Sequence, residues 1–332
     1  MPDVILLGDI NVDMIASFPA YPVWGGEGVA GTLEYHTGGG VVSTARALAN
    51  MGVSVGLIGR IGSDALAQQV RSDLEKVGID LTQLQLDPVV STGLIYIVVT
   101  PDGERTMFSV RGANVFTQIR SDVEQYFIGS RWYHFSGYSL LAEPQSSAAI
   151  HGLESARQQR CRVSLDPGPE LALRYQKRTI ELLPKIDVFF PNESELFGLS
   201  GRRDIKDGVQ ILLEQGCKSI VVKAGRQGCI IADEKQYLEI PGFEVQVNDT
   251  TGAGDSFNAG VALGRMVGLS WPASGVLGNA LGAMACARKG SGAGTINAKQ
   301  VEELIAQDQF KPQWANLQSA LEAARAWLQL ID

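Results

Sequence analysis

The chain has 332 residues, of which 45% are hydrophobic and 19% are charged, and its formal net charge is −8 at pH 7. This length and apolar content suffice for one large α/β domain or two smaller ones. The acidic balance and the lack of a basic stripe argue against nucleic acid as a partner, although local backbone N–H groups can still bind a phosphate-bearing ligand.

The cysteines and the N-terminus indicate a reduced, cytoplasmic protein. None of the four cysteines has C-x-x-C or zinc-finger spacing, so we expect buried thiols. Residues 1–3 carry no basic region before the first apolar run, so we expect no signal peptide. The longest uncharged run, residues 266–287, contains Pro272 and Asn279 and predicts a pair of packed helices instead of a membrane span.

The first 37 residues predict a strand followed by an irregular segment. Residues 4–9 form a short apolar run that contains Gly8 near its end, typical of a buried strand that leads into a functional loop. Asn11 and Asp13 follow, and on an extended segment their side chains point to the same side. Residues 14–37 are rich in Gly, Pro and aromatic residues without a helical period, which favours a flap of short strands and turns.

Regular elements follow this segment. Residues 41–51 predict a helix that ends at Gly52, residues 53–58 a strand, and residues 64–77 a helix that ends at Gly78. Two alternating runs, residues 92–100 and 104–110, flank a Pro-Asp-Gly turn and predict a β-hairpin.

From residue 117 onward, helices alternate with short apolar strands, which indicates a mostly parallel sheet covered on both faces. The flap and the hairpin predict a separate antiparallel layer. The candidate strands are residues 131–135, 162–165, 188–190, 219–223 and 229–232, and the last two helices are residues 298–307 and 313–330.

The stretch from Val247 to Phe257 has the pattern of a strand end, a glycine turn and a helix with an acid in its first turn. Gly252 and Gly254 allow backbone conformations that a side chain forbids. Several N–H groups then point to one spot, and the helix dipole makes that spot suitable for an anion. The pattern predicts a phosphate cradle with Asp255 as a catalytic carboxylate; the alternative is that Asp255 only caps the helix.

The residues required by three other kinds of phosphate-binding or hydrolytic site are absent from the sequence. The P-loop pattern G-x-x-x-x-G-K-[ST] is absent, and Gly8-Asp9-Ile10-Asn11 does not supply the G-x-G-x-x-G of a dinucleotide fold. A metal hydrolase needs histidines at ligand spacing, whereas His36, His134 and His151 are isolated. We expect each histidine to be exposed or to have its hydrogen bonds satisfied.

The combined motifs resemble those of one known family. Asp249-Thr250-Thr251-Gly252-Ala253-Gly254-Asp255-Ser256-Phe257 resembles the C-terminal signature of the ribokinase-like (PfkB) carbohydrate kinases. Gly38-Gly39-Gly40 and Gly59-Arg60-Ile61-Gly62-Ser63-Asp64 are similar to the N-terminal signature. Asn192-Glu193-Ser194-Glu195 resembles the N-x-x-E element, and residues 221–228 resemble the nucleotide loop. The similarity runs from residue 4 to residue 296 in the order of the family.

The resemblance implies a three-layer α/β/α sandwich with a mostly parallel central sheet and a small β-sheet lid. It assigns residues 1–10, 38–90 and 113–332 to the core, and residues 11–37 and 91–112 to a lid over the sugar site. The implied activity is transfer of the γ-phosphate of ATP to a primary hydroxyl of a small carbohydrate. Lids of this family often pair between subunits, so we expect a homodimer through the lid, with no nucleic acid or membrane partner.

In the family, the acid at Asp255 takes the proton from the attacking hydroxyl. Backbone N–H groups of Gly252, Ala253 and Gly254 would stabilise charge on the transferred phosphoryl group. We expect a lowered pKa for Asp255, because it lies at a helix N-terminus, and hence a weak base. A weak base is tolerable because the transition state is loose and positioning matters more than basicity.

The resemblance also assigns the other ligand contacts. Ser43 stands where the family usually has Asn, and its shorter side chain has less reach toward the sugar. Asn192 and Glu195 suit the organisation of water around Mg²⁺, but they could equally cap a helix that follows Pro191. The implied sugar contacts are Asn11, Asp13, Gly38, Gly39, Gly40, Ser43 and Asp255. The implied nucleotide contacts are Asn192, Lys223, Gly225, Gly228, Gly254 and Asn279. The implied metal contacts are Glu195 for Mg²⁺ and Asp249, Thr251, Ala285, Arg288, Gly290 and Gly294 for K⁺.

Two alternative functions stay open. A nucleoside kinase of the same fold would need an aromatic-lined pocket, which Phe18, Tyr21 and Trp24 could supply. A non-catalytic sugar-binding regulator would be favoured if the acid or the glycine turn at residues 252–254, called the anion turn below, had been replaced by other residues. Asp255 and the anion turn are both present here. The sequence also leaves open which sugar is selected, because pocket shape decides the stereochemistry.

Overall fold

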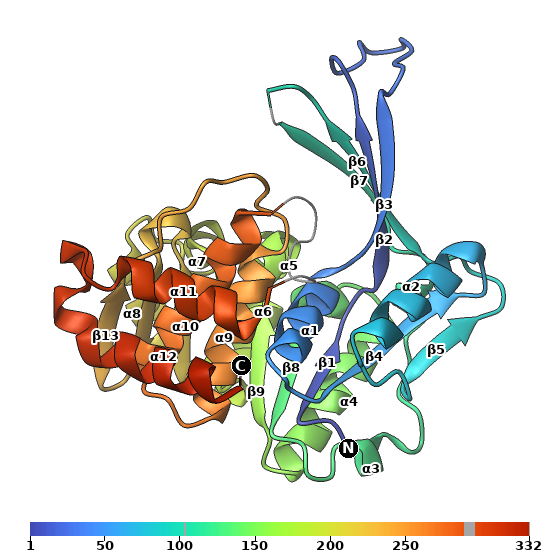
Figure 1. The fold of residues 1–332 in the computed structure, drawn as a ribbon. Helices are drawn as coiled ribbons and strands as arrows, with labels where there is room; N and C mark the ends of the chain where they lie inside the picture. The colour runs from blue at the N-terminus through green and yellow to red at the C-terminus, as the bar shows by residue number, and fades with distance from the viewer. Residues whose placement is uncertain (103, 289–295, 332) are drawn as a thin grey trace.

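The computed structural model describes residues 1–102, 104–288 and 296–331, and a nine-stranded sheet forms its centre (Figure 1). The strands of this sheet are β1 Val4–Leu7, β4 Val55–Gly62, β5 Leu84–Asp87, β8 Trp132–Ser136, β9 Arg162–Asp166, β10 Val188–Phe189, β11 Ser219–Lys223, β12 Cys229–Asp233 and β13 Gln236–Ile240. Their spatial order is β13-β12-β11-β10-β9-β8-β1-β4-β5. Pairing is parallel from β11 to β5, and β12 and β13 add an antiparallel edge.

Helices cover both faces of the sheet, as the alternation of strands and helices predicts. Successive side chains of β1 belong to different apolar clusters, Val4 and Leu6 on one face and Ile5 and Leu7 on the other. The first face carries α1 Gly40–Asn50, α2 Ala65–Lys76, α9 Ala253–Met266, α10 Trp271–Cys286, α11 Ala298–Asp308 and α12 Gln318–Ile331. The second face carries α3 Val123–Tyr126, α4 Gln145–Gln158, α5 Gly168–Arg174, α6 Gln176–Leu182, α7 Glu193–Ser200 and α8 Ile205–Glu214.

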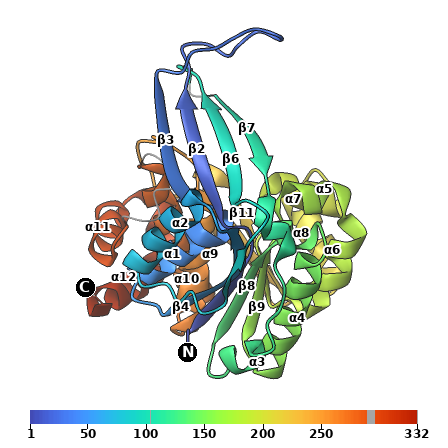
Figure 2. The same cartoon turned by 90° about the vertical axis from the view of Figure 1, so that its right-hand side faces the viewer.

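A second, four-stranded sheet stands away from this sandwich (Figure 2). It consists of β2 Asn11–Ser17, β3 Thr32–Gly38, β6 Gly93–Val99 and β7 Arg105–Val110, in the order β3-β2-β6-β7. The predicted separate layer is confirmed, but it is not purely antiparallel, because β2 and β6 pair in parallel. Some large apolar side chains on this sheet are 42–57% exposed, namely those of Leu33, Tyr35, Met107, Phe108 and Val110, whereas Val12, Ile97 and Val98 are buried.

The three-layer architecture and the predicted hairpin are confirmed, and most strand boundaries agree within two or three residues. Two edge strands, β5 and β13, were not predicted, because each alternates weakly and is only partly buried. The second of the two predicted C-terminal helices divides into a 3₁₀ helix, Pro312–Leu317, and α12.

The uncharged run 266–287 holds one helix, α10, and not the predicted pair, because α9 ends at Met266 where the run begins; α10 packs instead on α9. A methyl group added at Gly260 would lie 2.7 Å from Cα of Gly278, so the two backbones meet directly. No helix within the described ranges is long and apolar enough to cross a membrane. Cys161, Cys217 and Cys229 are buried thiols, whereas Cys286 is only partly buried.

Candidate active site

The carboxyl ends of the parallel strands meet at the edge of the sandwich from which the second sheet rises (Figure 1). In open α/β sheets, ligands bind at this edge, in the loops that follow the strands. Strand β1 leads through residues 8–10 into β2, β9 ends at Asp166, and β11 ends at Lys223. The fold therefore brings the segments predicted to bind sugar and nucleotide to one edge.

Helix α9 begins in the predicted glycine turn. Gly252 adopts the left-handed conformation there, with φ 74°. Asp249 holds the start of the turn, because its Oδ1 accepts a hydrogen bond of 2.8 Å from the Thr251 N–H. No side chain of the described residues caps this helix end, which leaves N–H groups of the first turn to an anion. Gly252, and not Asp255, occupies the N-cap position, and Asp255 lies in the first turn of the helix.

The carboxylate of Asp255 lies beside the start of α1. A methyl group added at Gly40 would lie 2.9 Å from Oδ1 of Asp255, so the backbone approaches the acid as closely as glycine permits. Thr44 Oγ1 donates a hydrogen bond of 3.3 Å to the Asp255 carbonyl and ties α1 to α9. A methyl group at Gly254, the next turn residue, would lie 3.7 Å from Nζ of Lys223. The acid, the anion turn and the ammonium group are thus neighbours.

The pKa of Asp255 shifts in the direction opposite to the expectation from sequence. Its burial and the negative charge of Asp166 raise the pKa to about 7, while the positive charge of Lys223 lowers it. The expected lowering of the Asp255 pKa is wrong, because the helix dipole stabilises the charged carboxylate less than the loss of water on burial destabilises it. A pKa near 7 makes Asp255 a stronger general base than an ordinary carboxylate.

Asp13 lies buried at the base of the second sheet, with 6% of its surface exposed. Its Oδ1 has no hydrogen-bond partner among the described residues. Burial raises the pKa of Asp13 to about 6, although the charges of His36 and Arg46 lower it. The backbone of Gly38 lies against this carboxylate. An unpartnered buried oxygen is costly, so it indicates a polar partner such as a hydroxyl donor.

Asn114 orients the strand that carries Asn11. Its Oδ1 accepts from the Ile10 N–H over 2.8 Å, and its Nδ2 donates to Oδ1 of Asn11 over 2.8 Å. Ser43 faces the anion turn, since a methyl group at Gly252 would lie 3.2 Å from its Oγ. Gly39 precedes α1 and stands next to Gly40 at the acid, with φ 108°.

An ion pair links the ends of β9 and β11. Lys223 Nζ lies 2.5 Å from Oδ2 of Asp166, which also accepts from Asn258 Nδ2 over 2.6 Å. Burial lowers the pKa of Lys223, but the charges of Asp166 and Glu195 outweigh burial and raise it. Lys223 therefore stays protonated, with the carboxylates of Asp166, Glu195 and Asp255 around it.

Asn192 and Glu195 form a reciprocal cap at the start of α7. Asn192 Oδ1 accepts from the Glu195 N–H over 2.9 Å, and Glu195 Oε2 accepts from the Asn192 N–H over 2.8 Å. The capping alternative is confirmed, and it does not remove Glu195 from the site. Glu195 is 4% exposed, and burial together with the charge of Asp166 raises its pKa to about 7. Gly225 and Gly228 bound a 3₁₀ turn after β11 with φ 55° and 98°.

Asn279 on α10 donates its amide hydrogens to the carbonyls of Ile240 and Pro241, over 3.1 and 2.9 Å. This amide therefore fixes the segment after β13. The end of α10 packs against the anion turn, because the N–H of Asp249 donates to the Cys286 carbonyl over 3.2 Å.

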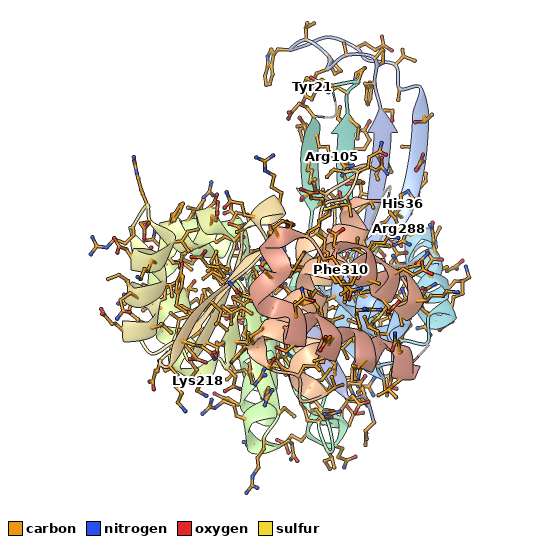
Figure 3. All side chains as sticks on the ribbon, turned by 60° about the vertical axis from the view of Figure 1, so that its left-hand side comes forward. Tyr21, His36, Arg105, Lys218, Arg288 and Phe310 are labelled. Atoms are coloured by element: carbon orange, nitrogen blue, oxygen red, sulfur yellow. The ribbon has the colours of Figure 1, made fainter. Side chains whose placement is uncertain are left out.

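The other residues that the sequence assigned to K⁺ do not all lie at the anion turn. Ala285 belongs to the α10 end that packs on the turn, but its carbonyl already accepts from the Arg288 N–H over 3.2 Å. The Arg288 guanidinium donates to Gln300 Oε1 over 2.8 Å and so points toward α11 (Figure 3). Gly290 and Gly294 lie outside the described residues.

Arg105 connects the second sheet to the anion turn. Its Nη2 lies 2.7 Å from Oδ2 of Asp249, and its Nη1 also donates to Thr251 Oγ1. Burial alone would raise the pKa of Asp249, but the hydrogen bonds from Arg105 and Thr251 keep it below its ordinary value. Of the residues predicted to hold K⁺, Asp249 and Thr251 thus face a cationic group in this structure, the guanidinium of Arg105.

Sequence reasoning missed Arg105, Asn114 and Asp166 as site residues. Only Asp166 carried a local signal, an acid followed by Pro167 at the end of an apolar strand. The histidine expectation is confirmed for His134, whose Nδ1 bonds Ser164 Oγ over 2.9 Å, and for partly exposed His36. Within the described ranges, no group of three or more His, Cys, Asp or Glu side chains is placed to hold a metal ion.

Comparison with known proteins identifies the family. Residues 1–298 match the pfkB family of carbohydrate kinases. A fructokinase of Salmonella typhimurium is 29% identical over 268 residues, which cover 78% of this chain and 82% of that one. A ribokinase of Staphylococcus aureus is 30% identical over 262 residues, 76% of this chain and 83% of that one. The structure of Arabidopsis thaliana ribokinase complexed with ribose and ATP superposes with a TM-score of 0.80 at 24% identity, covering 91% of this chain and 98% of that one. With this match over nine-tenths of its length, the chain belongs to the pfkB family of carbohydrate kinases.

Proposed function

We propose that this kinase transfers the γ-phosphate of ATP to a primary hydroxyl of a small sugar, with Asp255 as the catalytic base. One observation carries the proposal: a carboxylate with a pKa near 7 lies at the first turn of α9, beside an uncapped glycine turn and an ammonium group. That arrangement supports proton removal from an alcohol next to a bound phosphoryl group.

The sugar would lie between the second sheet and α1. Asp13 has a buried oxygen without a partner, and a sugar hydroxyl would satisfy it. Asn11, with its amide oriented by Asn114, would bond a second hydroxyl. The backbone of Gly38, Gly39 and Gly40 leaves room for the ring and directs its primary hydroxyl to Asp255. The N–H groups of Gly252, Ala253 and Gly254 would then stabilise charge that gathers on the phosphoryl oxygens.

The nucleotide would bind along the ends of β10 and β11. Lys223 would approach its phosphates, with Gly225 and Gly228 as backbone contacts and Asn279 beside the base. Glu195 and Asn192 are the oxygen donors that would organise water around Mg²⁺ near the phosphates. When bound, the ion would neutralise phosphate charge. The raised pKa of Glu195 supports this role, since a dication would stabilise its charged form.

We assign residues 11–37 and 91–112 to a lid that excludes water from the reacting groups. The exposed apolar side chains of its sheet support a homodimer through this lid. Two of the three aromatic residues that would serve a nucleoside, Tyr21 and Trp24, do not support that alternative, whereas Phe18 is partly buried. Trp24 is fully exposed, Tyr21 is 51% exposed, and Figure 3 places Tyr21 near the tip of the lid, whereas Arg105 lies closer to the core.

The test of this function is ADP release with a panel of pentoses, hexoses and nucleosides at saturating ATP and Mg²⁺. We expect sugar-dependent ADP release above the ATPase rate without sugar, and a phosphorylated product blocked at its primary hydroxyl. The Asp255→Asn variant provides the blank. Binding of a sugar without ADP release would support the regulator instead, and release only with nucleosides would support the nucleoside kinase.

We predict that K⁺ raises kcat/KM, because Asp249 and Thr251 form a buried anionic site next to the anion turn. The measurement compares initial rates in K⁺, Na⁺ and choline buffers of equal ionic strength. In Arg105→Gln, half-activation should need less K⁺, since the neutral side chain no longer competes for the Asp249 carboxylate.

The control for this prediction is Arg120→Gln, which removes an exposed arginine paired with Asp122 elsewhere on the surface. It should leave the K⁺ response unchanged. Equal rates of the wild-type protein in all three buffers would remove Asp249 from the set of metal ligands.

A further inference from the structure

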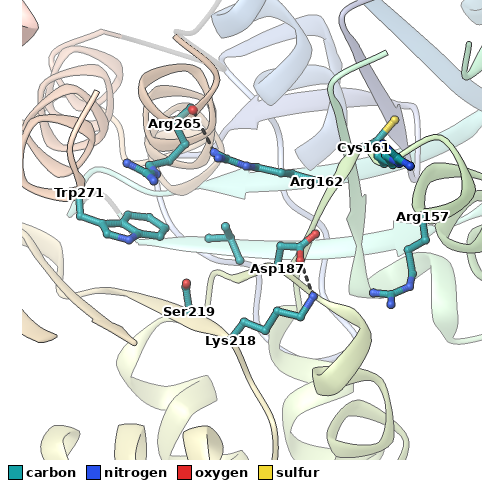
Figure 4. A pocket seen from close by; sticks show the side chains of 10 residues that line it. Arg157, Cys161, Arg162, Asp187, Lys218, Ser219, Arg265 and Trp271 are labelled. Atoms are coloured by element: carbon teal, nitrogen blue, oxygen red, sulfur yellow. Dashed lines mark hydrogen bonds and ion pairs between the residues drawn. The ribbon is translucent and has the colours of Figure 1, made fainter. Parts of the chain in front are cut away.

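A hollow of about 490 Å³ lies at the amino-terminal edge of the central sheet, opposite the candidate active site (Figure 4). It is bordered by the first residues of β9, β10 and β11, by the end of α4, and by the connection from α9 to α10. Its polar and charged lining consists of Arg157, Arg160, Arg162, Asp187, Lys218, Ser219 and Arg265, next to Trp271 and Cys161.

The hollow concentrates positive charge in a chain that is acidic as a whole. Five cationic side chains and one carboxylate line it, whereas the net charge of the chain is −8. Asp187 is already engaged, since its Oδ1 lies 2.6 Å from Lys218 Nζ and its Oδ2 accepts from the Val163 N–H. Among the described residues, no carboxylate lies within ion-pair distance of any of the four arginines.

Neutral groups hold these arginines in place. Arg162 Nη1 donates to the Arg265 carbonyl over 2.9 Å, and Arg157 Nη1 donates to the Lys185 carbonyl over 3.1 Å. The Arg265 guanidinium lies 4.3 Å from the ring centre of Trp271. These contacts hold the guanidinium groups of Arg157, Arg162 and Arg265 without neutralising them, so their charge remains available to a ligand.

The cations also repel one another. Burial and the positive charge of Arg162 lower the pKa of Arg265, and Asp233 opposes this only in part. Repulsion between fixed cations raises the free energy of the unliganded pocket. A bound anion would remove it.

The backbone of Arg160 provides an independent observation. It is the one residue other than glycine in the described ranges with positive φ, at 59°, and it follows the end of α4. Glycine with positive φ follows α1, α2, α8 and α9 at Gly52, Gly78, Gly216 and Gly268. A left-handed arginine costs stability that glycine would not. A side chain kept in a strained position indicates a function for that side chain.

We propose that this pocket binds the phosphate group of a small phosphorylated molecule. Guanidinium forks match phosphate oxygens in pairs, and the volume is in the range of small-molecule sites. The pocket is separate from the active site, because Arg162 and Asp166 mark opposite ends of β9, about 13 Å apart for an extended strand. The inference therefore does not depend on the proposed function.

The test is a titration with sodium tripolyphosphate and inorganic phosphate, read by the fluorescence of Trp271. Because Trp271 contacts Arg265, an anion in the pocket should change its emission with a saturable dependence on concentration. The change should be much smaller in Trp271→Phe, because Trp132 beside Arg162 is then, among the described residues, the remaining tryptophan next to a lining arginine, while calorimetry still detects the binding. Anions at the active-site edge would not produce this difference.

Two pocket variants and a control sharpen the test. Arg160→Gly should weaken binding by about tenfold and yet raise the melting temperature by about 1–3 °C, because it removes the strained backbone. Lys218→Gln should also weaken binding. Arg71→Gln, which removes one exposed charge on α2, should leave affinity unchanged.

Three results would overturn the proposal. One is a response that sodium chloride at equal ionic strength reproduces. Another is equal weakening by Arg71→Gln and Arg160→Gly. The third is a saturable fluorescence change of the same size in Trp271→Phe and in the wild-type protein.

Discussion

Asp255→Asn is expected to lower kcat by a factor of about 10²–10⁴, while the affinities for ATP and sugar stay close to those of the wild-type protein. Asparagine keeps the shape of the side chain and its contact with Gly40, but it cannot accept the proton of the attacking hydroxyl. Steady-state kinetics give kcat, and calorimetry gives both affinities. A variant that retains more than a few per cent of the wild-type rate would contradict the role of Asp255.

The pH dependence separates a base from a residue that only positions substrate. Since Asp255 must be unprotonated to act, kcat/KM of the wild-type protein should fall as pH drops below about 7. The residual activity of Asp255→Asn should lack this acid limb. A wild-type limb near pH 4 would mean that the carboxylate has an ordinary pKa, against the environment described here.

The same substitution should stabilise the fold at high pH. The folded-state pKa of Asp255 lies above its unfolded value, so its contribution to stability is present below pH 3.8 and is lost as pH rises through about 7. Asp255→Asn does not lose this contribution, so its free energy of unfolding relative to the wild-type protein should increase from pH 4 to 7, by at most about 4 kcal/mol. Urea unfolding at pH 5 and pH 8 measures the difference. Glu214→Gln, at an exposed carboxylate, should show none of it.

The parts of the site that sequence could predict are those encoded within a few residues. The turn at Gly252 requires glycine for its left-handed backbone, and the run Gly38-Gly39-Gly40 brings backbone against Asp255. Such requirements leave a mark at the position itself. The alternation of apolar runs likewise predicted the layers of the sandwich, because each face of β1 belongs to a different core.

What the sequence did not predict depends on contacts between distant segments. Arg105 meets the anion turn across 146 residues, and Asn114 meets Ile10 across 104. Nothing near Arg105 distinguishes it from a solvated arginine on a hairpin. The predicted direction of the Asp255 pKa shift was wrong for the same reason. The helix dipole can be inferred from local sequence, whereas the burial of Asp255 and its proximity to Asp166 arise only in the folded chain. Burial by residues distant in sequence made the pKa shift of Asp255 upward.

Lys223→Met is expected to lower the free energy of unfolding at pH 8 by about 3–5 kcal/mol, besides impairing nucleotide binding. Methionine keeps most of the volume but removes the charge that faces Asp166, leaving a mostly buried carboxylate unpaired near Glu195 and Asp255. Urea unfolding of the two proteins measures the loss.

The chain supplies a matched control for burial. Lys218 and Asp187 form a pair of nearly the same length, 2.6 Å against 2.5 Å, but the lysine is 47% exposed compared with 15% for Lys223. Because water screens the exposed pair, Lys218→Met should cost less than about 1 kcal/mol. Similar losses in the two variants would show that burial does not govern the strength of the Lys223 pair.

The sign of the pH dependence tests the same cause. In the wild-type protein, burial would raise the pKa of Asp166, but the positive charge of Lys223 and the hydrogen bonds from Lys223 and Asn258 together outweigh burial and lower it. The stabilising contribution of Asp166 is therefore present above pH 3.8 and is lost as pH falls. In Lys223→Met that pKa should rise, and stability should then be lost as pH rises. The deficit of the variant is therefore largest at pH 8 and smallest near pH 4. Adding Asp166→Asn should recover most of it, because no buried charge is then left without a partner. A double variant no more stable than Lys223→Met would assign the loss to packing of the lysine stem.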